Sequence, residues 1–315
     1  MTLLNKNKIL LYSFVFSFGL ISSFSLPPYN LFYINFFSYP ALLWTLLYYS
    51  KDKIVSFNIG WIFGFGYFIS NLYWITNSLT FEDIFKPLIP FALILIPLFL
   101  GLFYGFSTLV FSFLNPKKNF LSILILATTM SIFEYIRSFL FGGFPWNLIA
   151  FSFVNYLEFI QILSITGTYA FNSIVILLFL FPTILFFNYK KKIKINIFIF
   201  VISTLFINYF GGNSNLKQFE MTEKKDLGFN IKIISPKVNI NRYFQNENPS
   251  EFILELINIS KPDPSIKTLF ILPEGILSSI YFEDLKKFKT LFSNNFSEKH
   301  KIILGMNINE KQKIY

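Results

Sequence analysis

The chain has 315 residues, of which 54% are hydrophobic and 21% are aromatic, while only 14% are charged. Soluble domains carry about 25% charged residues, so this composition excludes an ordinary soluble protein and indicates a membrane protein with several spans. The net charge of +10 comes mostly from short basic clusters between apolar runs, which favours membrane topology over nucleic-acid binding, and no nucleic-acid partner is expected. The absence of cysteine excludes disulfides, thiolate metal ligands and a cysteine nucleophile within these residues.

Seven apolar runs are long enough to cross a bilayer, which takes about 20 residues per helix. The first run follows the basic sequence NKNK without a small-residue cleavage site, which predicts a retained anchor rather than a cleaved signal peptide. In the third run, the spacing of Gly60 and Gly64 suits close helix packing. The expected spans are 8–26, 31–49, 54–79, 87–114, 119–140, 160–187 and 193–210.

Lysines lie in alternate connections between these spans. Four segments on one side contain ten of them, whereas the opposite loops contain a single lysine, Lys86. By the positive-inside rule the N-terminus is expected in the cytoplasm, and an odd number of spans then places the residues after 210 in the periplasm of a bacterium. The ten lysines are Lys6, Lys8, Lys51, Lys53, Lys117, Lys118, Lys190, Lys191, Lys192 and Lys194.

The C-terminal part alternates strand-like and helix-like sequences. FNIKIISPKVNI, IKTLFILPEG and KIILGMNI have the character of strands, and NPSEFILELINIS and FEDLKKFKTLFSNN have helical periodicity. The order β-α-β-α-β predicts a parallel sheet, although three strands and two helices are few for a complete α/β domain of this type. We therefore expect a multi-pass α-helical membrane bundle at 1–212, a linker at 213–227 and an incomplete α/β domain at 228–315.

Glu274 is the first candidate for chemistry. It follows the second expected strand in the sequence FILPEGIL, and functional groups in parallel α/β sheets gather at the carboxyl ends of strands. Pro273 fixes the turn and Gly275 leaves room beside the carboxylate, which suits a general base. The alternative interpretation is an acid in a turn that caps the next helix.

Glu134 and Arg137 form a second candidate site near the outer end of the fifth span. They are three residues apart and so lie on one helical face. Ionisable groups at that depth are costly and usually paired, so the two are either functional or a structural ion pair that steadies the following loop. That loop, FGGFPWN, places Trp146 at the depth where aromatic belts form. The sequence shows no phosphate-binding loop, nucleotide fingerprint or metal-ligand cluster, and no cofactor or metal is expected.

These elements together resemble the apolipoprotein N-acyltransferase family. The resemblance is carried by the seven spans, by GFGYFISNLYWI and FEYIRSFLFGGFPWN, by the segment that opens with IKIISP, and by LPEG. It implies a bundle in the bacterial inner membrane coupled to a periplasmic nitrilase-like (carbon–nitrogen hydrolase, αββα) domain and a final eighth span. It also implies lipoprotein maturation, in which an acyl chain passes from a phospholipid donor to the N-terminal amine of a diacylglyceryl apolipoprotein acceptor.

The resemblance implies roles for individual residues. The family uses a Glu-Lys-Cys triad in which the glutamate of a PE motif is the general base, and Glu274 matches that position. The cysteine takes the acyl chain as a thioester, which the lipoprotein amine then attacks. Phe244 stands in the first-strand loop, where the family usually has a Lys-Trp pair; it joins Glu134, Arg137 and Trp146 as a candidate for positioning substrate or loops. The triad's lysine and cysteine follow later strands, which this chain lacks, and no cysteine is present.

Four interpretations follow. The first is a fragment of an N-acyltransferase, cut within its nitrilase-like domain and inactive alone. The second is a non-catalytic membrane protein that binds lipid or lipoprotein. A small transporter with an outer cap is disfavoured, because the spans contain few charges and no repeated broken helices. An amidase of the nitrilase class with a soluble substrate would not need seven spans.

Overall fold

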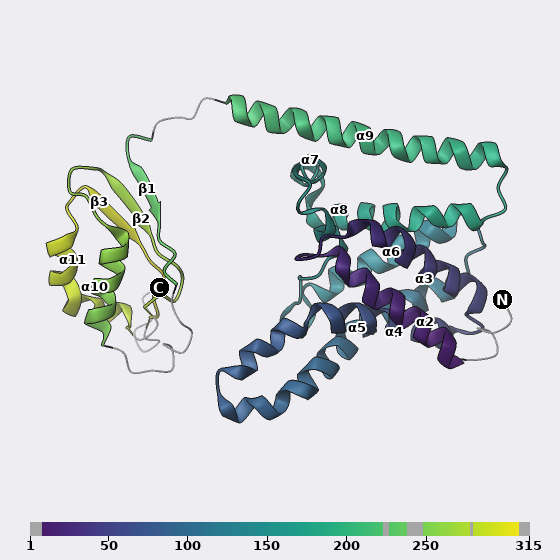
Figure 1. The fold of residues 1–315 in the computed structure, drawn as a ribbon, viewed down its shortest axis with the longest axis horizontal. Coiled ribbons are helices and arrows are strands. Elements are labelled where there is room, and N and C mark those ends of the chain that lie inside the picture. The colour runs from purple at the N-terminus through teal and green to yellow at the C-terminus, as the bar shows by residue number, and fades with distance from the viewer. Residues whose placement is uncertain (1–7, 223–226, 238–247, 278–279, 309–315) are drawn as a thin grey trace. The chain divides into compact units, whose positions relative to one another are not determined.

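The computed structural model describes residues 8–222, 227–237, 248–277 and 280–308. The chain divides into two compact units, Met1–Thr222 (unit 1) and Glu223–Tyr315 (unit 2), which are shown in Figure 1. Unit 1 is helical, and unit 2 contains a small parallel sheet with helices.

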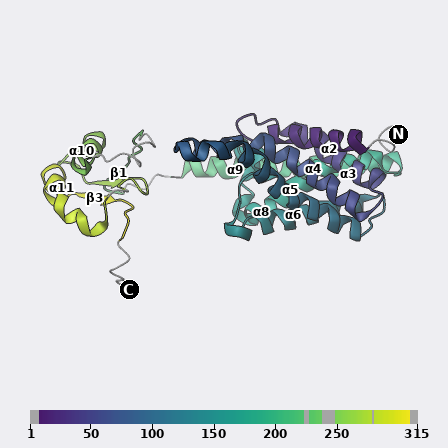
Figure 2. The same cartoon turned by 90° about the horizontal axis from the view of Figure 1, so that it is seen from below.

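Unit 1 consists of α-helices joined by short 3-10 helices (Figures 1 and 2). The α-helices are α2 (Lys8–Ser22), α3 (Asn35–Tyr49), α4 (Lys53–Asn71), α5 (Ile89–Phe113), α6 (Phe120–Arg137), α7 (Leu157–Ile160), α8 (Leu163–Leu180) and α9 (Lys191–Met221). The 3-10 helices are η1 (Ser23–Ser25), η2 (Phe32–Ile34), η3 (Tyr73–Thr80), η4 (Asp83–Leu88), η5 (Leu140–Gly142), η6 (Ile149–Phe153) and η7 (Phe181–Phe186). Each expected span therefore contains an α-helix.

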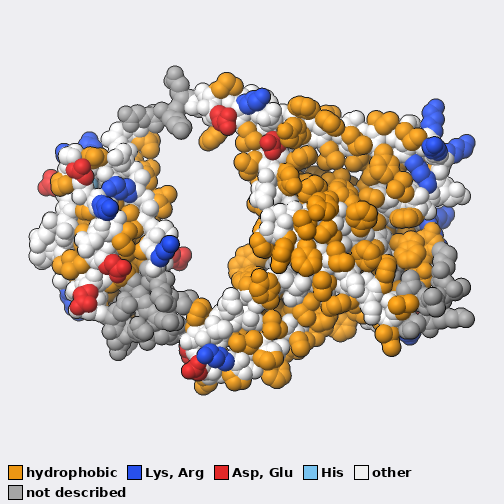
Figure 3. Space-filling view, in the orientation of Figure 1, with side chains coloured by type: hydrophobic (Ala, Val, Ile, Leu, Met, Phe, Trp, Pro, Cys, Tyr) orange, Lys and Arg blue, Asp and Glu red, His pale blue; other side chains and the backbone are white. Residues whose placement is uncertain are grey.

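Four helical segments of the described chain are long and apolar enough to cross a membrane. They are Asp83–Phe113, Phe120–Arg137, Leu163–Phe186 and Lys191–Met221. Helix α2 is apolar but shorter, and α3 and α4 do not reach the same combination of length and hydropathy. Hydrophobic side chains also cover the visible surface of the helices (Figure 3), so unit 1 is a membrane-embedded helical region.

Three of the expected spans differ from the observed helices in ways that change the fold, two of them at an end and one in its interior. In the third span the α-helix ends at Asn71, because the aromatic and β-branched residues that follow have a lower helix propensity. These residues form η3, and η3, η4 and the start of α5 together make a projecting hairpin (Figure 1). Gly167, with φ +71, interrupts the sixth. Helix α9 continues to Met221, so residues 213–221, expected in the linker, are helical.

The contact between α4 and α5 is the most extensive in unit 1. An added Cβ atom at Gly60 would lie 2.4 Å from the carbonyl oxygen of Tyr104, and one at Gly64 would lie 2.9 Å from the α5 backbone. The hydroxyl groups of Ser56 and Thr108 donate to each other's carbonyl oxygens, at 2.7 and 2.8 Å. The close packing predicted from the glycine spacing is confirmed.

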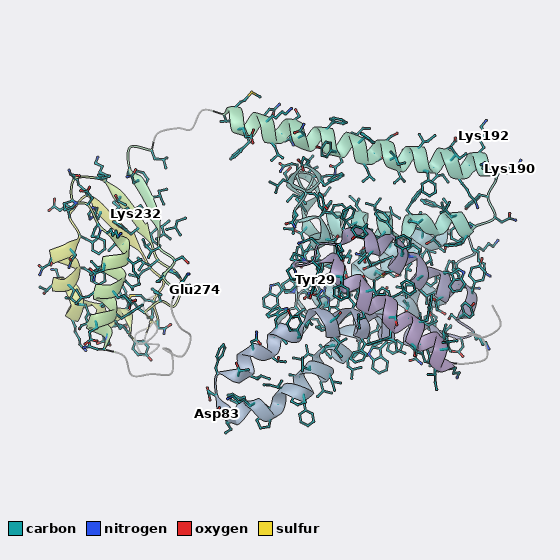
Figure 4. All side chains as sticks on the ribbon, in the orientation of Figure 1. Tyr29, Asp83, Lys190, Lys192, Lys232 and Glu274 are labelled. Atoms are coloured by element: carbon teal, nitrogen blue, oxygen red, sulfur yellow. The ribbon has the colours of Figure 1, made fainter. Side chains whose placement is uncertain are left out.

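Charged side chains are distributed unevenly along unit 1. Lysines gather at one end (Figure 3), where Lys190 and Lys192 lie, whereas Asp83 lies at the opposite end (Figure 4). Asp83 forms an exposed ion pair with Lys86, with an N–O distance of 2.6 Å. The lysine-rich end is the one that the sequence assigns to the cytoplasm.

Unit 2 contains a three-stranded parallel sheet. Its strands β1 (Asn230–Ile233), β2 (Thr268–Ile271) and β3 (His300–Ile303) lie in the order β1-β2-β3. The connections contain α10 (Pro249–Ser260) and then η9 (Phe282–Phe288) with α11 (Lys289–Asn295). The β-α-β-α-β order and the parallel pairing are confirmed. The helix expected over 282–295 divides at Phe288 into a 3-10 and an α-helical part.

The two faces of this sheet differ in their covering. Helices α10 and α11 lie on one side (Figure 1), and Phe270 of β2 is fully buried on that side, with its ring centroid 5.2 Å from that of Phe296. On the other face Ile231, Ile233 and Ile303 are exposed. Within the described part of unit 2, one apolar face of the sheet is therefore uncovered.

Candidate functional site

Glu274 lies in a turn shortly after the end of β2, and its side chain is exposed. Gly275, the next residue, has φ +66, a left-handed conformation that glycine adopts without strain. Gly305, which follows β3, approaches so closely that a Cβ atom there would lie 3.2 Å from the Cα atom of Glu274. The carboxylate thus lies at the carboxyl end of the parallel sheet, beside the loop after β3.

Among the residues that the structure describes, the Glu274 carboxylate caps no helix. The next helical element, η9, has Tyr281 at its N-cap and no side-chain capping bond. No hydrogen bond joins the carboxylate to any other residue that the structure describes. The carboxylate is accordingly available to a group brought to this end of the sheet, and its role as a base stays a prediction.

Glu134 is buried inside unit 1, with 1% of its surface exposed. Its Oε1 atom accepts a hydrogen bond from the hydroxyl of Tyr104 on α5, at 2.8 Å, and its Oε2 atom accepts one from Nδ2 of Asn172 on α8. The Oδ1 atom of Asn172 accepts in turn from the backbone N–H of Ala150, at 2.9 Å. This carboxylate therefore ties α6 to α5 and α8, and through Asn172 to η6.

Arg137 is also buried, one turn further along α6. Its Nη1 atom donates to the carbonyl oxygens of Phe144 and Trp146, at 2.9 and 2.8 Å. The guanidinium carbon lies 5.2 Å from the ring centroid of Phe68 and 5.6 Å from that of Phe144, which is cation–π geometry. The Nε and Nη2 atoms are buried and donate to no described acceptor.

The structural ion pair between Glu134 and Arg137, one of the two interpretations of these residues, does not form in the structure. The described residues form salt bridges at Lys86–Asp83 and Lys287–Asp284, and none between these two side chains. The physical reason is that each group has polar partners of its own, which for Glu134 come from other helices and for Arg137 from the following loop. Steadying of that loop, the other part of the expectation, is what the Arg137 contacts do.

The loop after α6 is held mainly through its backbone. Besides the bonds from Arg137, the carbonyl oxygen of Asn147 accepts a hydrogen bond from the hydroxyl of Tyr67 at 3.0 Å. The indole of Trp146 is half exposed and lies against two aromatic rings, with centroid distances of 6.0 Å to Trp74 and 5.3 Å to Phe144. Trp146 is thus fixed at its carbonyl and exposed at its ring.

The structure brings three of the five predicted site residues together. Arg137 binds the carbonyl oxygen of Trp146, and Glu134 lies one turn before Arg137 on α6, while Glu274 belongs to unit 2. Phe244 lies outside the described residues. Among the parts of the chain that are described, no group of three His, Cys, Asp or Glu side chains is placed to hold a metal ion.

Sequence reasoning missed Tyr104 and Asn172, the two partners of Glu134. The sequence does contain a signal for Asn172: it is an amide within the apolar run TYAFNSIVILLFL, and a polar group inside a span needs an internal partner. The sequence contains no comparable signal for Tyr104, which is one of 17 tyrosines in an aromatic-rich chain.

Comparison with known proteins identifies the family. Residues 18–181, more than half of the chain, match the family model described as the apolipoprotein N-acyltransferase N-terminal domain. The apolipoprotein N-acyltransferase of Agrobacterium fabrum is 28% identical over 257 residues, which are 78% of this chain and 47% of the relative. The protein of that name from Brucella suis is 30% identical over 192 residues, which are 58% of this chain and 36% of the relative. The one from Allorhizobium ampelinum is 32% identical over 176 residues, which are 53% of this chain and 33% of the relative.

The matched region and the buried polar residues coincide. Residues 18–181 include Glu134, Arg137 and Trp146 together with their partners Tyr104 and Asn172. Glu274 lies beyond that region, and the chain spans less than half the length of each of these three relatives. The protein belongs to the apolipoprotein N-acyltransferase family.

Proposed function

We propose that this protein takes part in the N-acylation of lipoproteins, in which an acyl chain passes from a phospholipid to the N-terminal amine of a diacylglyceryl-cysteine lipoprotein. The observation that carries the proposal is a family-matched bundle followed in the same chain by Glu274 at the carboxyl end of a parallel strand. A membrane-embedded bundle suits this reaction because the donor and the acceptor both reside in the bilayer.

Glu274 is the general base of the proposed reaction. Its carboxylate takes the proton of a thiol, and the thiolate attacks an ester carbonyl of the phospholipid. A C–S bond forms, the C–O bond breaks, and the leaving alkoxide takes up a proton as lysophospholipid. The lipoprotein amine then attacks the thioester carbonyl, so that the C–N bond of the amide forms as the C–S bond breaks. The proton that the amine loses returns to the departing thiolate, which restores the thiol. The nitrilase-like fold belongs to this proposal, which the β-α-β-α-β order of unit 2 supports.

The 315 residues contain no cysteine, so the proposal places the thiol outside them. It places the lysine of the triad there too, because the family carries that lysine after a later strand. We expect this chain alone to bind phospholipid without transferring an acyl group. The same observation favours a second candidate function, a non-catalytic membrane protein that binds lipid or lipoprotein.

The proposed location is the bacterial inner membrane, with the N-terminus in the cytoplasm and unit 2 in the periplasm. The gathering of lysines at one end of unit 1, where Lys190 and Lys192 lie, supports this orientation.

The test of the proposed base is Glu274→Gln in the native gene, in its own cells, with the masses of lipoprotein N-terminal peptides as the readout. We expect the N-acylated form to be replaced by the diacylglyceryl form with a free amine. Glu255→Gln is the matched control, because Glu255 is an exposed glutamate on α10. N-acylation that persists in Glu274→Gln cells would refute the role of this residue.

The second candidate function is separated by two further measurements. Deletion of the gene without loss of N-acylated lipoproteins would favour lipid or lipoprotein binding without chemistry. Acyl transfer by the purified 315-residue chain in phospholipid vesicles would contradict the expectation that its nucleophile lies elsewhere.

A further inference from the structure

His300 is the only histidine of the chain, and it is the first residue of β3 in unit 2. Both nitrogens of its imidazole ring have partners. Nε2 lies 2.8 Å from the carbonyl oxygen of Asp263, in the loop between α10 and β2. Nδ1 lies 3.1 Å from the backbone nitrogen of Ser297, in the turn between α11 and β3. The ring therefore joins the start of β3 to the loop before β2 and to the turn that precedes it.

These two contacts define the protonation state of the His300 ring. A backbone N–H only donates, so Nδ1 accepts from Ser297 and carries no proton. A carbonyl oxygen only accepts, so Nε2 carries the proton and donates to Asp263. An imidazolium has a proton on both nitrogens and would turn an N–H group toward the N–H of Ser297. Protonation thus removes one of the two hydrogen bonds and sets two donors against each other.

Aromatic side chains fix the orientation of the same ring. It lies edge-on to Phe270 of β2 and to Phe296, with centroid distances of 5.3 and 5.8 Å and interplanar angles of 88° and 87°. Phe270 is fully buried on the covered face of the sheet. An imidazolium cannot rotate away from Ser297 without leaving these ring contacts, so the turn at Ser297 is the part that yields.

Charged groups surround the ring from β1, from the loop before β2 and from the turn before β3. The Asp263 carboxylate accepts from the hydroxyl and the N–H of Ser265, at 2.6 and 2.9 Å. These hydrogen bonds, with smaller effects of Lys232 and His300, lower the pKa of Asp263. Asp263 therefore stays ionised throughout the range in which histidine titrates, and its own titration does not interfere there.

The attraction between the Asp263 carboxylate and an imidazolium is weak, because this carboxylate is exposed and screened by water. It is also opposed by two lysines. Lys232 of β1 donates to the carbonyl oxygen of Lys261 at 2.8 Å, and Lys299 donates to that of Ser265 at 3.1 Å. The hydrogen bond to Ser297, rather than net charge, thus decides which form of the ring fits. The other charged residues of these segments are Lys261, Lys267, Glu298 and Lys301.

We propose that His300 is an acid-sensitive latch, which joins β3 to the loop before β2 when its ring is neutral and releases the turn at Ser297 when its ring is protonated. Histidine changes charge between about pH 8 and pH 5. The stability that the Nδ1 bond adds is therefore present above this range and is lost as the pH falls through it. Strand β3 leads to Gly305, beside Glu274, so release loosens the strand next to the candidate base. Any effect on acyl transfer rests on the proposed function.

Hydrogen exchange of the full 315-residue chain in detergent tests the latch, with mass spectrometry at about pH 7.5 and about pH 5.5 as the readout. The rates are corrected for the pH dependence of chemical exchange. We expect the amides of residues 297–303 to exchange at least about threefold faster at the lower pH, since one hydrogen bond is worth roughly two- to tenfold in an equilibrium constant. Equal protection of these residues at the two pH values would overturn the proposal.

Two variants separate the imidazole from the neighbouring carboxylate. His300→Gln has no titrating group, but its amide can still donate to the carbonyl oxygen of Asp263, and we expect the pH response of residues 297–303 to disappear. Asp263→Asn keeps that backbone carbonyl and removes the carboxylate, and we expect the pH response to remain. A response that persists in His300→Gln, or one that vanishes in Asp263→Asn, would assign the effect to another group and refute the latch.

The ring itself provides a readout that needs no variant. Because the chain contains one histidine, a sample labelled in its histidine ring nitrogens and purified without a histidine tag gives the magnetic resonance signals of His300 alone. We expect the neutral form with its proton on Nε2 at the higher pH, and we expect protonation to coincide with faster exchange. Protonation without faster exchange, or a neutral ring with its proton on Nδ1, would contradict the latch. Neither measurement depends on acyl transfer, so failure of this proposal and failure of the Glu274 test are distinguishable.

Discussion

The hydroxyl of Tyr104 donates a 2.8 Å hydrogen bond to the Oε1 atom of Glu134, and this bond links α5 to α6 within the membrane-embedded bundle. Asn172 of α8 donates to the other carboxylate oxygen, so both oxygens of a buried acid are satisfied by neighbouring helices. Removing one donor leaves part of a buried carboxylate unmet, which is more costly than the net gain from an ordinary hydrogen bond.

Tyr104→Phe should lower the free energy of unfolding of unit 1 by about 1–3 kcal/mol, because the carboxylate loses a donor that water cannot replace. All four tryptophans, Trp44, Trp61, Trp74 and Trp146, belong to unit 1. Denaturant unfolding in detergent, followed by tryptophan emission, therefore reports on this unit alone. Tyr135→Phe is the control, since Tyr135 on α6 is half exposed, and its cost should stay within about 0.5 kcal/mol. Equal losses in the two variants would show that the bond to Glu134 contributes nothing specific.

Gly60→Ala should also destabilise unit 1, by about 1–3 kcal/mol, because a methyl group there would press on the backbone of α5 and separate it from α4. The matched control is Gly211→Ala on α9, where an added Cβ atom has no neighbour within 4 Å. Alanine is the better helix former, so the control should be neutral or slightly stabilising. The same tryptophan unfolding experiment measures both, and a neutral Gly60→Ala would mean that α4 and α5 do not pack this closely.

Arg137→Lys should loosen the loop after α6, although the charge is kept. A lysine ammonium is a point charge without the planar fork and does not reproduce both carbonyl bonds and the two ring contacts. We expect backbone amides in residues 144–150 to exchange hydrogen at least about tenfold faster, measured by mass spectrometry. Peptides from α10 in the same sample serve as the internal control. Unchanged exchange in the loop would show that something other than Arg137 holds it.

Features set by local sequence were predictable. Apolar runs and helical periodicity placed an α-helix in every expected span, and the alternation of strand and helix patterns gave the parallel order of unit 2. The spacing of Gly60 and Gly64 also predicted a close helix contact, because an interval of four residues fixes a face of the helix without knowledge of the partner.

Features set by distant partners were not predictable. Glu134 and Arg137 lie on one face of α6, as their spacing requires, yet Glu134 binds residues 30 and 38 positions away in the sequence. Only the packing of α5 and α8 brings Tyr104 and Asn172 to the carboxylate. The free donor edge of Arg137 likewise depends on a fold in which Nη1 is the atom that meets the loop.

The uncovered face of the sheet in unit 2 leads to a prediction with a built-in comparison. Ile233 is 77% exposed on that face, whereas Ile253 of α10 is 1% exposed in the cluster beneath the helices. Both are isoleucines, so replacement by threonine makes the same chemical change in the two places. If the face is uncovered in the protein, Ile233→Thr should cost less than about 0.5 kcal/mol, while Ile253→Thr should cost about 2 kcal/mol or more.

Hydrogen exchange of peptides within residues 248–308 measures the two variants, because unit 2 contains no tryptophan. Faster exchange in Ile253→Thr alone would agree with the observed covering of the sheet by α10 and α11 on one side. A comparable effect of Ile233→Thr would contradict it, because an exposed methyl group has little burial energy to lose. That result would mean that a further surface packs on the face that carries Ile233, Ile231 and Ile303, and that the sheet leading to Glu274 is held from both faces.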